Sequence, residues 1–87
     1  MTVEPGKFAE VCGPLVPGQS VAWSFKADRR MSFNIHYHEG KQVVFPLKKD
    51  STAAARGKLA VSSDQSYCWM WKNPGTMPST LRLQLSR

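Results

Sequence analysis

The chain lacks a long hydrophobic segment and a signal-peptide pattern. Its longest uninterrupted apolar run is five residues, Tyr67 to Trp71, whereas a helix needs about 20 apolar residues to cross a bilayer. Met1 to Pro5 have neither the basic region nor the apolar region of a secretion signal. We therefore expect no membrane span. The compartment stays open at this point, because an exported protein loses its signal on maturation.

Motifs that identify an enzyme are also absent. The sequence contains no GxSxG, HExxH, phosphate-binding loop or dinucleotide-binding glycine pattern. A nucleophilic pair of cysteine and histidine is conceivable, but a disulfide would remove the nucleophile. We predict that the protein is not an enzyme and uses no cofactor.

Cysteine is scarce. Cys12 and Cys68 are the only two, and they do not form a CxxC motif. Two cysteines cannot supply a structural zinc site by themselves. They can form one disulfide, or they can remain two buried thiols that pack as small hydrophobic side chains.

Acidic residues are few in comparison with basic ones. The 87 residues include 12 Lys and Arg but only 6 Asp and Glu, which gives a net charge of +6. Such a charge favours anionic partners or surfaces. The basic residues are scattered, with no block longer than two, as is typical of a solvated surface. We therefore expect the partner to be a protein or another macromolecule rather than a nucleic acid.

Helical spacing is nearly absent, and apolar residues alternate with polar ones at a period of two. The length allows one domain, residues 1–87. The pattern predicts an all-β, antiparallel β-sandwich of about seven short strands, and the alternative is a small OB-like barrel. The candidate strands are residues 8–11, 19–27, 31–38, 42–45, 59–61, 67–72 and 81–85.

The segments between these strands indicate how they are connected. Residues 28–30 (Asp-Arg-Arg) form a predicted turn, and Gly40 indicates a hairpin after residue 38. Pro46 places the following strand at a sheet edge, because proline cannot donate a ladder hydrogen bond. Residues 48–57 form the longest polar connection, with at most one helical turn at residues 52–55.

The segment 31–38 has the cleanest alternation in the chain. Phe33 and Ile35 point to one face, which we predict to be buried core. His36 and His38 point to the other face, which we predict to be solvated.

The two histidines are also a candidate metal site. Residues two apart on a strand project from the same face, so His36 and His38 can reach one ion. A third ligand would have to come from a neighbouring segment, and Glu39, Glu10 and Asp50 are the candidates. Ordinary surface histidines are the alternative interpretation.

The strand at residues 67–72 is apolar on both faces, so its orientation is ambiguous. Trp69 and Trp71 can belong to the core, where large rings dominate the buried area. They can instead form an exposed platform for unstacked bases or sugars. In that second interpretation they contribute to a binding surface with Lys48, Lys49 and Arg56 of the polar connection.

Several positions resemble a known family. The frame comprises Cys12, Leu15 and Gly18, then Phe-Asn-Ile-His at 33–36, Gly-x-Leu-x-Val at 57–61, and Tyr-Cys-Trp-Met-Trp-Lys-Asn at 67–73. This arrangement is similar to the GOLD (Golgi dynamics) domain, a β-sandwich of trafficking cargo receptors and some lipid-transfer proteins. The resemblance extends over residues 7–87, and a stand-alone bacterial relative of the domain fits this chain.

The resemblance implies a disulfide between Cys12 and Cys68 and the character of an interaction module. We therefore predict a non-catalytic binding module that works outside the cytoplasm, in a periplasm or as a secreted protein. A cytoplasmic location is the alternative if no signal peptide was removed. Two other functions stay open: a nucleic-acid-binding OB-like barrel, and a small metal-binding protein that uses His36 and His38.

Overall fold

The protein is described by a computed structural model that covers residues 1–87. It consists of strands that pair in antiparallel fashion and contains no helix, so the all-β prediction is confirmed. None of its elements is a helix of the length and hydrophobicity that crossing a membrane requires. There are six strands rather than about seven: β1 (Thr2–Val3), β2 (Phe8–Leu15), β3 (Ser20–Glu39), β4 (Gln42–Ala60), β5 (Gln65–Lys72) and β6 (Ser79–Ser86).

A long hairpin of β3 and β4 organises the fold. The two strands pair from Ser20 opposite Ala60 to Glu39 opposite Gln42, with three interruptions of the register. Gly40 begins the two-residue turn with φ of 61°, a backbone conformation that glycine adopts without steric cost. The predicted glycine hairpin is therefore present, and it is much longer than the sequence indicates.

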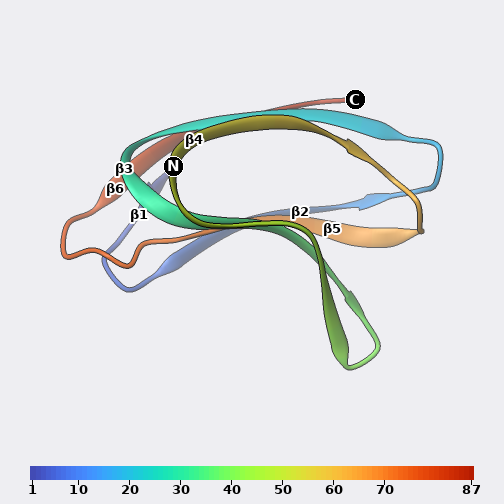
Figure 1. Ribbon diagram of the computed structural model, residues 1–87, viewed down its shortest axis with the longest axis horizontal. Coiled ribbons are helices and arrows are strands. Elements are labelled where there is room, and N and C mark those ends of the chain that lie inside the picture. Colours follow the sequence, from blue (N-terminus) through green and yellow to red (C-terminus); the bar gives the residue numbers. More distant parts are fainter.

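The hairpin bends sharply near its middle (Figure 1). Lys26 lies opposite Ala54 and Met31 lies opposite Thr52, so residues 27–30 of β3 face only residue 53 of β4. The extra residues bulge and bend both strands. Residues 28–30 are thus the corner of a continuous strand, and the turn predicted there is wrong.

Residues 48–57 belong to β4 instead of forming a polar loop. Neither the loop nor a helical turn at 52–55 is present. Alanine has a low intrinsic preference for strands, but Ala54 and Ala55 pair with Lys26 and Phe25 of β3. Pairing with a strand that is anchored in the core outweighs the local preference.

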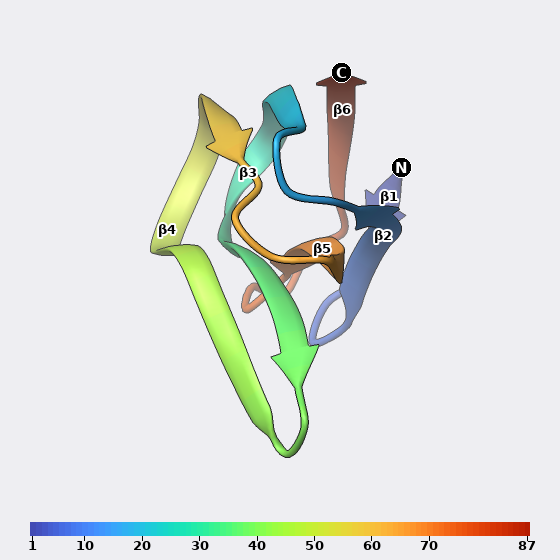
Figure 2. The same cartoon turned by 90° about the vertical axis from the view of Figure 1, so that its right-hand side faces the viewer.

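The two halves of the hairpin, on either side of its bend, belong to two different layers (Figure 2). The first half of β3 pairs with β6, and β6 pairs with β1. The second half of β3 pairs with β5, and β5 pairs with β2. The result is one antiparallel sheet that curls into a half-barrel, with an upper layer that contains β6 and a lower layer that contains β5.

The hydrophobic core lies between the two layers. Phe33 and Ile35 are each only 1% exposed, as predicted from the alternation. Phe33 stacks on Trp71 with ring centroids 5.4 Å apart, and Phe25 meets the same tryptophan edge-on at 5.5 Å. The buried cluster consists of Val3, Leu15, Val21, Trp23, Phe25, Met31, Phe33, Ile35, Leu59, Val61, Tyr67, Trp69, Trp71 and Leu81.

Asp28 connects the corner of β3 to the start of β6 through hydrogen bonds. Its Oδ1 accepts hydrogen bonds from the Thr80 backbone N–H at 2.9 Å and from the Ser79 hydroxyl at 3.0 Å. These two donors, the Thr80 amide first, hold the pKa of the Asp28 carboxyl below its ordinary value of 3.8. A lowered folded-state pKa adds stability that is present above the unfolded pKa and is lost as the pH falls through the folded one.

Replacing Asp28 with alanine is therefore expected to lower the melting temperature at neutral pH, because the two donors lose a charged acceptor. The difference from the parent protein should shrink as the pH falls below 3.8. Thermal unfolding followed by circular dichroism over a pH series measures it. A difference that stays constant down to the most acidic condition would show that the charge of Asp28 has no part in holding the corner.

Candidate functional site

The disulfide lies on the outer surface of the lower layer. Cys12 of β2 and Cys68 of β5 are bonded and stand directly opposite each other, with a Cα–Cα distance of 4.1 Å. Cys68 is buried, whereas Cys12 is exposed to solvent. The predicted bond is confirmed, and it joins the edge strand β2 to β5.

The structure shows which side chains of β5 point into the core and which point outward. Trp69 and Trp71 turn into the core and are 3% and 0% exposed, while Cys68 and Met70 turn outward. The prediction of an exposed platform of tryptophans is therefore wrong. The indole N–H groups of both tryptophans are buried without a hydrogen-bond partner.

The prediction that His36 is solvated is wrong, although the face assignment is right. His36 and His38 share the outer face, with ring centroids 5.4 Å apart, and His38 is exposed. His36 is only 4% exposed, because side chains from neighbouring strands cover it. Glu10 of β2 contacts one side of the imidazole, and Phe45 of β4 lies 5.8 Å away, centroid to centroid.

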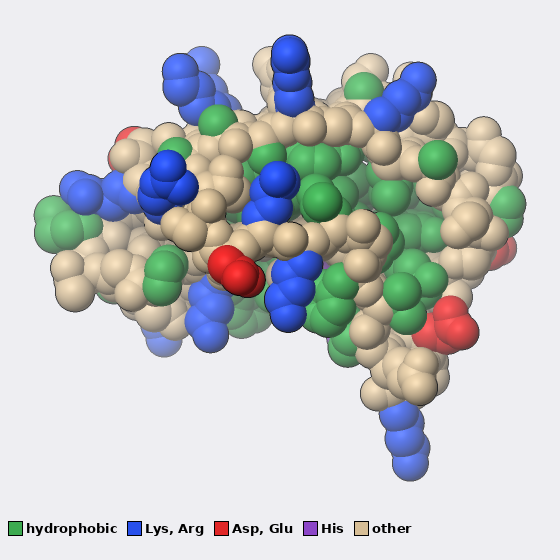
Figure 3. Space-filling model, in the orientation of Figure 1, with side chains coloured by type: hydrophobic (Ala, Val, Ile, Leu, Met, Phe, Trp, Pro, Cys, Tyr) green, Lys and Arg blue, Asp and Glu red, His purple; other side chains and the backbone are tan.

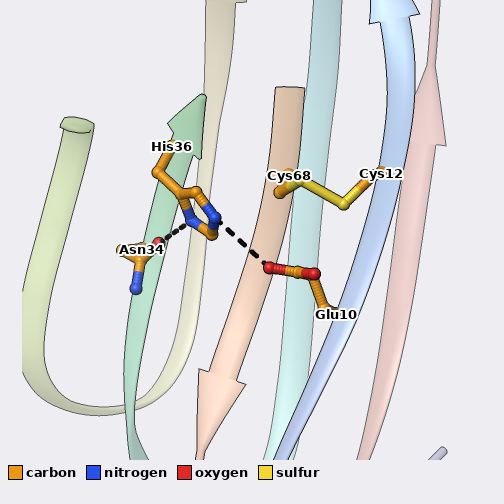
Figure 4. The surroundings of a disulfide bond; sticks show 5 residues. All are labelled: Glu10, Cys12, Asn34, His36 and Cys68. Carbon is orange, nitrogen blue, oxygen red and sulfur yellow. Dashed lines mark hydrogen bonds and ion pairs between the residues drawn. A yellow bond between two sulfur atoms is a disulfide. The ribbon is translucent and has the colours of Figure 1, made fainter. Parts of the chain in front are cut away.

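The polar contacts of His36 fix its orientation (Figure 4). Nδ1 lies 2.6 Å from Asn34 Oδ1, and Nε2 lies 3.2 Å from Glu10 Oε2. Both partner atoms are acceptors, so a neutral imidazole can donate to only one of them and an imidazolium can donate to both.

Of the three candidate third ligands, only Glu10 forms an ion pair with a histidine side chain. Glu39 and Asp50 form no hydrogen bond or ion pair with His36 or His38. The sequence could not distinguish among these carboxylates, because the choice depends on which strands lie side by side.

A hydrophobic patch adjoins the two histidines. Phe8 is 63% exposed, and Val43 and Phe45 are each 43% exposed. With Met70 they line a shallow groove of about 330 Å³ beside Glu10, His36 and His38. We did not predict this patch, since Phe8 and the 42–45 segment come together only through the order of the strands.

The second candidate site is the free edge of β4. This 19-residue strand pairs only with β3, so its other side presents unpaired backbone groups. Pro46 lies on it, which confirms the predicted edge position. The strand exposes four basic side chains and one acidic one: Lys48, Lys49, Arg56, Lys58 and Asp50.

A cleft opens between the two halves of β4 that lie on either side of its bend, where the half-barrel does not close. Figure 3 views the molecule from this side and shows hydrophobic side chains between two rims that carry Lys and Arg. The cleft has a volume of about 310 Å³. Its apolar lining is Trp23, Ile35, Pro46, Leu47 and Leu59, and its basic lining is Lys49, Arg56 and Lys58.

Gly57 lets the indole of Trp23 lie against this edge. The two residues are directly opposite each other, and a Cβ at Gly57 would come within 2.8 Å of Trp23 Cζ2. Gly57→Ala is therefore expected to cost about 1–3 kcal/mol through overpacking. Chemical denaturation of the variant measures this loss.

Gly13 provides the control, because it also lies within a strand and a Cβ there meets no atom within 4 Å. Gly13→Ala should leave stability within about 0.5 kcal/mol of the parent. Equal effects of the two substitutions would contradict the close approach of Trp23 to β4.

Comparison with known proteins supports the fold. No family model matches the chain, and no curated protein matches it. A de novo designed double-stranded β-helix, solved by solution NMR, superposes with a TM-score of 0.57 at 20% identity, over 99% of this chain and 94% of the designed one. This likeness shows the curled antiparallel architecture alone, so the resemblance to the GOLD domain stays a prediction.

Proposed function

We propose that the protein is a non-catalytic binding module whose β4 edge and adjoining cleft take an extended, acidic segment of a protein partner. The observation that carries the proposal is the apolar cleft framed by Lys49, Arg56 and Lys58 beside an unpaired strand edge. The GOLD-like frame in the sequence, with its implied interaction role, favours the same conclusion.

The backbone of β4 supplies the first element of recognition. An extended segment can add to a free strand edge, where main-chain hydrogen bonds provide affinity and side-chain pockets provide specificity. Because β4 bends at its middle, a straight segment can pair with only one half of the strand. The half at residues 52–60 carries Arg56 and Lys58 and borders the cleft.

Charge selects the kind of partner. Two copies of this chain joined edge to edge would bring their basic residues together, and like charges across a strand pair are destabilising. Lysine on an edge strand is a known protection against such self-association. An acidic segment meets the same residues with complementary charge, which favours a different protein over a second copy.

The cleft is large enough to take a side chain. Small-molecule pockets have volumes of roughly 300–1,000 Å³, so about 310 Å³ is at the lower end of that range. An apolar side chain of the bound segment can enter between Leu47 and Leu59 while its acidic neighbours reach the rim. The segment we expect thus alternates acidic and apolar residues.

Two observations favour a protein over a nucleic acid. Trp69 and Trp71 are buried, so they offer no face on which unstacked bases could stack. A disulfide is more typical of secreted and periplasmic proteins than of cytosolic ones. It also supports an extracytoplasmic location.

Fluorescence anisotropy tests the proposal with a labelled peptide of about ten residues that alternates Glu and Leu. A peptide with Lys in place of Glu, and a single-stranded DNA of similar length, serve as competitors. The double variant Lys49→Glu with Arg56→Glu should weaken binding of the acidic peptide by at least about tenfold. Lys7→Glu with Lys72→Glu changes the net charge equally at exposed positions outside the cleft, and it should leave binding nearly unchanged.

If the two double variants lose equal affinity for the acidic peptide, the binding depends only on net charge and the proposal is overturned. Equal affinity for the lysine peptide would overturn it as well. DNA binding that is tighter than peptide binding, and that depends on Lys49 and Arg56, would replace the protein partner with a nucleic acid.

A further inference from the structure

Three potential metal ligands, Glu10, Cys12 and Cys68, lie close together at the disulfide, and His36 contacts the first of them (Figure 4). Glu10 and Cys12 are two apart on β2, Cys68 pairs with Cys12 across to β5, and His36 of β3 pairs with Cys68 on its other side. The ligand atoms of Glu10, Cys12 and Cys68 all lie within 4.8 Å of one another. His36 Nε2 lies 3.2 Å from Glu10 Oε2.

We propose that reduction of the Cys12–Cys68 disulfide converts this cluster into a zinc site whose ligands are two thiolates, the His36 imidazole and the Glu10 carboxylate. The oxidised protein has no thiolates to offer, so zinc binding is controlled by the redox state. This site is separate from the proposed β4 interface and does not depend on it.

The ligand types suit zinc, and one of the spacings does. Zinc takes Cys, His and carboxylate ligands at about 2.0–2.3 Å in tetrahedral geometry, which places ligand atoms roughly 3.3–3.8 Å apart. The separation of His36 Nε2 from Glu10 Oε2 is already close to this value. After reduction the two sulfurs have to move apart, and the exposed position of Cys12 leaves room for its side chain to rotate.

The environment of His36 resembles that of a metal ligand. Asn34 Oδ1 holds Nδ1 at 2.6 Å, which leaves Nε2 directed at Glu10. A hydrogen bond at the other ring nitrogen is the usual way in which a protein orients a ligating histidine. Nε2 and the Glu10 carboxylate face each other at 3.2 Å, so one cation can contact both.

The redox step is a thiol–disulfide exchange with a dithiol reductant of the compartment in which the protein works. The dithiol gives two electrons and two protons to the Cys12–Cys68 bond, which breaks into two thiols, and the dithiol closes to its own disulfide. Zinc then displaces the two thiol protons to the solvent as the thiolates bind it. In the reverse direction a disulfide oxidant accepts two electrons from the two thiolates and two protons from the solvent, the Cys12–Cys68 bond forms again, and zinc is released.

Cobalt(II) titration tests the site, because thiolate coordination gives cobalt a charge-transfer absorption. The full-length protein is titrated anaerobically, once oxidised and once reduced with a phosphine that is then removed, and zinc is added to displace the cobalt. We expect the reduced protein alone to give the thiolate absorption at about one equivalent. Glu10→Gln and His36→Gln should each weaken zinc binding by at least about tenfold.

His38→Gln is the matched control. It alters a neighbouring histidine that contacts the His36 ring but belongs to no part of the proposed ligand set. If it weakens binding as much as His36→Gln does, or if the oxidised protein binds zinc equally well, the site is instead the pair of histidines and the proposal fails. Reduction can unfold the chain. In that case, the site is supported if zinc restores the strand circular dichroism of the reduced parent but not that of Glu10→Gln or His36→Gln. Binding that is unaffected by either variant overturns it.

Discussion

Replacing Trp71 with alanine is expected to destabilise the protein by about 3–5 kcal/mol, the largest effect of any single substitution that we predict. Trp71 is 0% exposed and contacts both Phe25 and Phe33, which belong to the two halves of β3. Its removal leaves a cavity where the two layers meet. Since small domains have total stabilities of roughly 5–15 kcal/mol, much of the variant should be unfolded at modest urea concentrations.

Trp71→Phe separates the ring contacts from the indole N–H. Phenylalanine keeps an aromatic ring against Phe25 and Phe33 and removes an N–H that has no partner, so the loss should be well below that of Trp71→Ala. Urea denaturation of both variants provides the comparison. Equal losses would mean that the aromatic cluster is not what holds the layers together.

Removal of the disulfide is expected to have the next largest effect. The bond connects residues 56 positions apart, and in the chain-entropy model a loop of this size contributes about 4 kcal/mol. The double variant Cys12→Ala with Cys68→Ala should therefore unfold at a markedly lower urea concentration than the oxidised parent.

The reduced parent protein, measured without metal, provides the reference for this variant. It should be destabilised to a similar extent, because both proteins lose the same covalent constraint. A double variant that is as stable as the oxidised parent would show that β2 is held to β5 by pairing and packing alone.

The parts of the fold that could be predicted are those in which a strand has one buried face. The alternation over residues 31–38 places Phe33 and Ile35 inside, because a shift of one residue would exchange the buried and exposed sets. Gly40 and Pro46 indicate the hairpin and the edge strand through their backbone chemistry alone. These signals are local, and the structure retains them.

The corner and the length of β4 could not be predicted, because they depend on pairing. Asp28 to Arg30 are polar and resemble a turn, yet they form a bulge because β4 continues beside them. Residues 48–57 contain no hydrophobic alternation strong enough to indicate a strand. Their partner is β3, which the sequence pattern had predicted as two separate strands with a turn at residues 28–30.

The same limit applies to the candidate sites. The alternation places His36 and His38 on one face, but it cannot show that Glu10 and Phe45 cover the first of them. The cluster of Glu10, Cys12, His36 and Cys68 depends on the strand order β3-β5-β2. Strand order across such sequence separations is decided by the packing of the whole core.

The most direct test of the proposed function is a map of backbone amide NMR shifts upon addition of the acidic peptide. If the peptide adds to the edge of β4, the amides of residues 52–60 should shift, while those of β2 stay unchanged. The amides that face the free edge, at every second residue, should exchange more slowly with solvent. Slower exchange is decisive, because a peptide that only neutralises surface charge forms no main-chain hydrogen bonds. Shifts concentrated on β2 and the His36 face, with β4 exchanging as before, would contradict the proposal.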